Sequence, residues 1–256
     1  MHSYSQPRTH HLFAFAVALA MGLGSASVFA GSWFGGETVK GNGIVKKQER
    51  SVGAFRGVEL SMAADVEVRL GAVDSVSIEA DENLLPLVES SVAKGTLRLK
   101  PIRKNLRLDG RTLKIVVTAK EIHELGVSGA GNITATGLKS PRLELEIAGS
   151  GTIDAKQVQT DVLEVSIGGS GTIKVGGTTR QFTAEIAGSG DIEAQQLKAD
   201  EAKVSIAGSG NASLWPVSSL KASIAGSGDV EYYGDPKMTS SIAGAGSVKR
   251  VGATPR

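Results

Sequence analysis

Cysteine is absent from this chain of 256 residues, which excludes disulfides, cysteine–zinc sites, thiol nucleophiles and a lipid anchor on cysteine. Aromatic residues make up only 4% of the chain, and after residue 30 no apolar run is long enough to cross a bilayer as a helix. The formal net charge is +2 at pH 7, so overall charge does not favour nucleic acid or a membrane surface as a partner. Glycine, in contrast, is abundant, with 33 residues.

The first 30 residues have the three parts of a secretory signal peptide. A basic start around Arg8 is followed by the apolar residues 12–24, and small residues around Ala30 suit cleavage after that position. We therefore expect an exported protein, located in the periplasm or, alternatively, at the cell surface or outside the cell. An uncleaved membrane anchor is the other interpretation of this segment.

A short glycine motif, most often Ile-Ala-Gly-Ser-Gly, occurs seven times in the second half of the chain. The copies begin at residues 127, 147, 167, 186, 206, 224 and 242, so their spacing is 18 to 20 residues. A fixed period near 20 residues predicts coils that stack on copies of themselves. Low-complexity disorder is the alternative for a glycine-rich chain, but here the apolar positions keep register with the glycines.

Each repeat alternates apolar and polar residues before the motif, as at Leu143, Leu145 and Ile147, which is typical of a half-buried strand. The glycine pair predicts a corner at which the backbone visits positive φ. The polar residue after the second glycine, such as Asp191 or Asp229, is expected to cap backbone groups at this corner. We predict an all-β fold, a single-stranded right-handed parallel β-helix (solenoid) with about 20 residues per coil, because parallel crossovers are right-handed.

The chain then divides into a signal peptide (1–30), a flexible N-terminal lead (31–50), one β-helix domain (51–250) and a tail (251–256). Within the domain, the strand pattern begins near Val52 but the glycine corners are missing before residue 127. We interpret this half as irregular N-terminal coils that close the core, followed by the seven regular glycine-corner coils. Residues 81–88 are expected to form a short helical turn.

Three stretches of sequence resemble a bacterial family, the putative auto-transporter adhesin, head GIN domain. They are residues 52–58 (VGAFRGV), residues 80–84 (ADENL) followed by Gly-Thr-Leu at 95–97, and the glycine series itself. The resemblance covers roughly residues 52–248. It implies an exported, single-stranded β-helical domain that has no established biochemical activity and no catalytic residues to transfer to this chain.

The clearest chemical asymmetry of the sequence is basic. Residues 94–114 contain eight lysines and arginines, with Asp109 as the only acid. Residues 101–105 and 109–110 are turn-like, so we expect an exposed loop with four candidate binding residues, which are Arg103, Lys104, Arg107 and Arg111. In the cell envelope this loop would meet an anionic glycan, lipopolysaccharide or an envelope protein. The alternative is an ordinary solvated strand face.

No pattern predicts a cofactor, a metal or a catalytic residue. Asp191 and Asp229 lack the nine-residue period of calcium-binding glycine repeats, and the glycine pairs lack the Gly-Lys-Ser/Thr of a phosphate loop. Outward glutamates such as Glu144 and Glu164 leave a carbohydrate-active enzyme, a polysaccharide lyase or hydrolase, as the alternative. We predict a non-catalytic cell-envelope module for adhesion or ligand binding, of an oligomeric state that the sequence does not specify.

Overall fold

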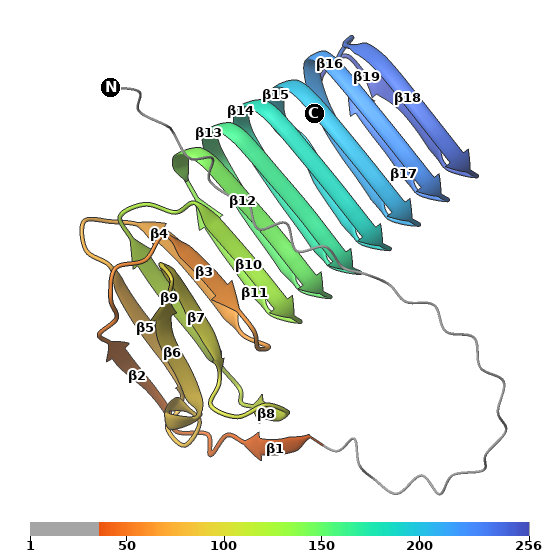
Figure 1. The fold of residues 1–256 in the computed structure, drawn as a ribbon. Coiled ribbons are helices and arrows are strands. Elements are labelled where there is room, and N and C mark those ends of the chain that lie inside the picture. Colours follow the sequence, from red (N-terminus) through yellow and green to blue (C-terminus); the bar gives the residue numbers. More distant parts are fainter. Residues whose placement is uncertain (1–35, 256) are drawn as a thin grey trace, which may run out of the picture. The chain divides into compact units, whose positions relative to one another are not determined.

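The computed structural model describes residues 36–255, which are mostly β-strand (Figure 1). The predicted signal peptide lies outside these residues. Seventeen strands of the described part form one continuous sheet, and β1 (Glu37–Lys40) and β8 (Leu106–Asp109) form a separate pair. In this part of the chain no helix is long and apolar enough to cross a membrane.

The second half of the chain is a regular stack of coils. Its strands are β10 (Glu124–Gly129), β11 (Asn132–Thr136), β12 (Lys139–Gly149), β13 (Thr152–Gly169), β14 (Thr172–Gly188), β15 (Asp191–Gly208), β16 (Asn211–Gly226), β17 (Asp229–Tyr233), β18 (Lys237–Gly244) and β19 (Ser247–Gly252). All pairings between successive coils are parallel. The predicted β-helix with about 20 residues per coil is confirmed. The last strand runs two residues into the predicted tail.

Apolar side chains stack in columns inside the coils. Ile147 pairs with Ile167, which pairs with Ile186, and the column continues through the remaining coils. These three side chains are at most 2% exposed. Burial of each stabilises the fold by about 1.5–3 kcal/mol relative to exposure, so the repeated isoleucine contributes to cohesion at every coil interface.

The two glycines of each motif serve different purposes at the corner. The first glycine of every motif adopts φ between +129° and +142°, a region that disfavours side chains, and pairs with its equivalent in the next coil. The second glycine lacks this positive φ but is buried from Gly131 to Gly228. A Cβ on Gly190 would lie 2.6 Å from Ile167 Cγ2 and 2.7 Å from the oxygen of Gly171. Packing therefore dictates the second glycine, and backbone conformation the first.

A polar column caps the last four corners, from Asp191 to Ser247, as predicted. Asn211 Nδ2 donates to Asp191 Oδ1 at 2.9 Å, and the backbone nitrogen of Asp229 donates to Asn211 Oδ1 at 3.3 Å. The backbone nitrogen and the hydroxyl of Ser247 then donate to Asp229 Oδ1 at 2.9 and 2.7 Å. Each side chain thus satisfies a group of the following coil.

The N-terminal half does not stack in chain order. Its elements are β2 (Val45–Arg50), β3 (Gly57–Leu60), β4 (Asp65–Leu70), β5 (Ser75–Asp81), the single 3-10 turn η1 (Leu85–Leu87), β6 (Val88–Ala93), β7 (Thr96–Pro101) and β9 (Leu113–Ala119). The coil made by β3 and β4 lies between the coil of β10 and β11 and that of β7 and β9, and all these pairings are parallel. The strands β2, β5 and β6 run antiparallel to their partners and cover this end. Of these strands, β5 and β6 connect the coil of β3 and β4 to the coil of β7 and β9. The sequence analysis predicted irregular coils in chain order and did not predict this antiparallel cap.

Strands, not a flexible lead, occupy most of the described part of residues 31–50. A buried carboxylate holds the connection between β1 and β2, because Asp81 is 0% exposed and accepts hydrogen bonds from the backbone nitrogens of Gly43 (2.6 Å) and Arg111 (3.3 Å). Its neighbour Asn83 donates to the oxygen of Lys40 at 2.8 Å. The family-like segment 80–84 therefore fixes the connection between β1 and β2 onto the capped end, and its last part precedes η1, the predicted helical turn.

Candidate functional site

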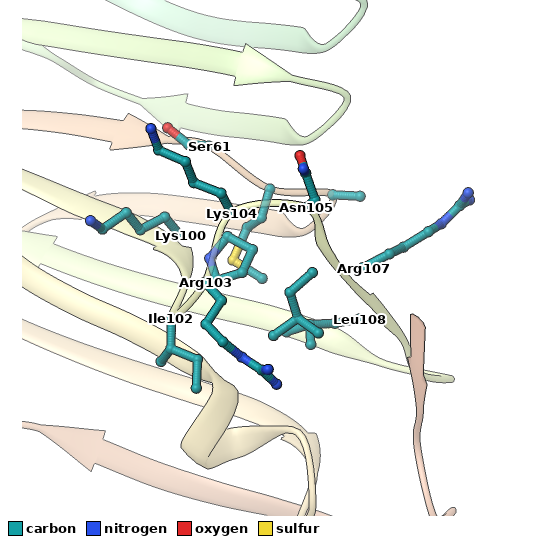
Figure 2. A pocket seen from close by; sticks show the side chains of 12 residues that line it. Ser61, Lys100, Ile102, Arg103, Lys104, Asn105, Arg107 and Leu108 are labelled. Carbon is teal, nitrogen blue, oxygen red and sulfur yellow. The ribbon is translucent and has the colours of Figure 1, made fainter. Parts of the chain in front are cut away.

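A pocket of about 410 Å³ lies between the turn joining β3 to β4 and the segment joining β7 to β8 (Figure 2). Met62 and Leu106, both buried, and the half-buried Leu108 line it with apolar surface. Ile102, 44% exposed, also lines it. Its polar lining comes from Ser61, Asn105 and the basic residues of the β7–β8 segment. The volume is within the range of about 300–1,000 Å³ typical of small-molecule sites.

The wall formed by β8 does not belong to the long sheet. Within the described residues its only sheet partner is β1, with Leu106 opposite Glu37 and Leu108 opposite Val39. Asn105 turns the chain into β8 with φ +60°, a conformation that asparagine tolerates better than most residues. β8 is therefore separated from the long sheet, and the pocket lies between β8 and the turn that joins β3 to β4.

The structure separates the four basic residues predicted to bind a ligand. Arg103, Lys104 and Arg107 line the pocket, whereas Arg111 does not line it, and its backbone nitrogen bonds to Asp81. Arg103 is neutralised by Glu37, with Nη1 3.0 Å from Oε2. Figure 2 shows the other two diverging: Lys104 extends to the same side as Ser61, and Arg107 points away from the pocket. Their role in binding stays a prediction.

Lys104 and Arg107 have no acidic partner among the described residues, in contrast to two cations on the neighbouring strand β7. Arg98 pairs with Glu59 at 3.1 Å across neighbouring strands, and Lys100 pairs with Glu89 at 3.5 Å. Among the residues that the structure describes, no acidic and no aromatic side chain lines the pocket. A positive charge without internal compensation therefore remains beside the apolar floor.

The sequence prediction identified the cations but not the floor. Met62 and Leu106 are 44 positions apart, and they meet because Leu60 pairs with Leu99 when β3 lies beside β7. Nothing in the alternation of either strand specifies that neighbour. The turn-like residues 101–105 predicted an exposed loop. They gave no indication that the loop lies beside apolar residues of the β3–β4 turn.

A second feature is an acidic area on the outer face of β3, β10, β12 and β13. Glu124, Glu144 and Glu164 occupy equivalent positions on adjacent strands, and Glu59 and Glu146 both pair with Gly126. Burial against the sheet, and then repulsion from Glu124 and Glu164, raises the pKa of Glu144 above its ordinary value. Burial, Glu144 and Glu59 raise the pKa of Glu146 in the same way. Among the described residues, no group of three or more His, Cys, Asp or Glu side chains is arranged to hold a metal.

This acidic area predicts a pH-dependent stability. Because the folded state raises these pKa values, it binds more protons than the unfolded chain, and stability falls as pH rises from about the ordinary value of 4.5 through the raised pKa. Glu144→Gln should therefore stabilise the protein at pH 7 by several tenths of a kcal/mol, since it removes like-charge neighbours, and have little effect at pH 4. Urea unfolding at both pH values measures this. Glu201→Gln, an exposed residue outside the area, is the control, and an equal gain there would contradict the explanation.

Comparison with known proteins gives the family. The model of the family described as "Putative auto-transporter adhesin, head GIN domain" matches residues 54–236. The chain belongs to this family. No match is found among the curated proteins.

Solved structures similar to this head GIN domain cover nearly all of its described part. A "putative lipid binding protein" from Parabacteroides distasonis is 32% identical with a TM-score of 0.72, and the match covers 84% of this chain and 100% of that one. A putative adhesin from Bacteroides fragilis is 23% identical with a TM-score of 0.78, covering 83% and 100%. One from Parabacteroides merdae is 24% identical with a TM-score of 0.62, covering 84% and 99%. The two adhesins support the fold alone. None of the three is named as an enzyme.

Proposed function

We propose that this protein is a non-catalytic, exported module of the cell envelope that binds an anionic partner beside the pocket under β8. The observation that carries the proposal is the pair of uncompensated cations, Lys104 and Arg107, on a segment that also lines a cavity. Uncompensated charge beside a cavity raises the local concentration of oppositely charged ligands. Export depends on the predicted signal peptide.

The names of the relatives are consistent with binding as the role. The family is described as an adhesin, and the relative with 32% identity is named as lipid binding. Both descriptions concern attachment to a molecule and not its conversion. The carbohydrate-active enzyme stays the alternative hypothesis, and neither name favours it.

Binding of the purified protein to lipopolysaccharide, to phosphatidylglycerol vesicles and to an anionic glycan tests the proposal, with phosphatidylcholine vesicles as the neutral reference. We expect binding to at least one anionic surface. We also expect at least about tenfold weaker binding by the double variant Lys104→Gln/Arg107→Gln, because a hydrogen bond to a charged group is worth about 1.5–3 kcal/mol.

The matched control is Lys221→Gln/Lys249→Gln, which removes two exposed cations that lie outside this pocket and have no acidic partner in the described part of the chain. This variant should bind as the unchanged protein does. An equal loss in both double variants would show that total charge matters and the site does not. Absence of binding to every anionic surface would refute the proposed function.

A further inference from the structure

The pocket under β8 combines an apolar surface with a cationic one. Its floor is apolar, because Met62 and Leu106 line it while being only 7% and 6% exposed. Its rim is cationic, and Lys104 extends from the rim toward the side on which Ser61 lies (Figure 2). Ile102 adds an exposed aliphatic side chain to the lining.

We propose that this pocket takes the alkyl chain of an anionic amphiphile, with the head group held at Lys104. The inference rests on the proposed function and names the ligand class of the same site. The chain would displace water from the surface of Met62, Leu106 and Leu108, which is favourable in proportion to the apolar area covered. The head group would supply the negatively charged partner that Lys104 does not have among the described residues.

Other ligand classes use only part of this site. A sugar ring prefers an aromatic platform and several polar groups, and no aromatic side chain of the described residues 36–255 lines the pocket. A free phosphate would pair with Lys104 but leave the floor hydrated. A neutral lipid would cover the floor but leave the charge of Lys104 without a partner. A ligand that is both anionic and aliphatic satisfies both halves.

The position of β8 suits an inserted chain. Because β8 pairs with β1 and not with the long sheet within the described part of the chain, a ligand between β8 and the β3–β4 turn interrupts no strand pairing of the coils. Ile102 remains tied to η1 through its backbone nitrogen, which donates to the oxygen of Leu87 at 3.0 Å. One side of the pocket is therefore the segment around Ile102, which is hydrogen-bonded to η1. The other side is β8, which takes no part in the pairing between coils.

A chain-length series tests the inference. Hexyl, octyl, decyl and dodecyl sulfate are titrated into the purified protein below their micelle-forming concentrations, and binding is followed by calorimetry. Each methylene that becomes buried should tighten binding by about fourfold, the equivalent of about 0.8 kcal/mol, until the pocket is full. Decyltrimethylammonium, which has the same chain and the opposite charge, should not bind at this site.

Two pairs of variants locate the site. Ile102→Ser should flatten the chain-length series, while Val73→Ser, which changes an aliphatic side chain exposed to 70% outside the pocket, should leave it unchanged. Lys104→Gln should weaken every member by a similar factor and preserve the slope, with Lys221→Gln as its control. Circular dichroism confirms that each variant is folded.

The outcomes separate this inference from the proposed function. If all chain lengths bind equally, with the same loss in Lys104→Gln, the anion site stands and the alkyl-chain site is refuted. If no alkyl sulfate and no anionic surface binds, both fail. Equal binding of decyltrimethylammonium would refute the anionic requirement. Decyl sulfate and phosphatidylglycerol vesicles distinguish the two sources of such a ligand. Binding to both indicates a lipid taken from a membrane, and binding to dispersed decyl sulfate alone indicates a free amphiphile.

Discussion

Gly188→Ala is expected to lower the free energy of unfolding by about 4 kcal/mol or more, the range of exceptional single substitutions. Gly188 has φ +129°, and a Cβ built there lies 2.4 Å from the backbone oxygen of Gly169 in the preceding coil. A backbone atom in a strand ladder cannot rotate out of the way as a flexible side chain can. The coils must separate at the corner, which disturbs the column of glycines on both sides.

Gly129→Ala provides the matched control for this substitution. Gly129 has φ +134° but no heavy atom within 4 Å of its added Cβ, because the pairing of β3 with β10 ends at Val127. It should therefore cost only the strain of an unfavourable backbone conformation, about 1–3 kcal/mol. Urea unfolding of both variants separates backbone strain from the collision. Equal costs would contradict the close stacking of the corners.

Ile186→Ala is expected to cost about 2–5 kcal/mol, the usual range for emptying a buried isoleucine site. Ile186 is 2% exposed and stands in its column between Ile167 and Ile206. The neighbouring coils are fixed by their backbone pairing and cannot collapse into the space. The cavity should therefore persist, and its full cost should appear in the unfolding free energy.

Ile242→Ala is the control within the same column. Ile242 pairs with Ile224 but belongs to the last coil and is 42% exposed. Its truncation should cost about 1 kcal/mol or less, because the side chain is already partly in water and packs against a neighbouring coil on one side only. Urea unfolding compares the two variants at equal protein concentration. A cost as large as that of Ile186→Ala would show that the open side of the last coil is covered in solution.

The basic residues of the candidate site could be predicted from the sequence, but their ion-pair partners could not. The residues Lys104 and Arg107 were identified as part of an exposed basic segment, and the structure places them on the lining of a pocket. Their companions Arg103 and Arg111 were grouped with them on the same grounds. The structure pairs Arg103 with Glu37, a residue of the segment predicted to be a flexible lead. A charge pattern counts residues but does not reveal which acids fold against them.

The coil, its period, the glycine column and the polar caps could all be predicted from the amino-acid sequence. In a solenoid each residue contacts its equivalent one coil away, so a contact such as Ile167 with Ile186 repeats in the sequence at a fixed spacing. The order of the first coils, the antiparallel cap and the pocket became known only from the folded structure. Pairings such as Leu60 with both Leu99 and Val127 follow no period. Alternation within a strand specifies which face is buried but not which strand lies alongside.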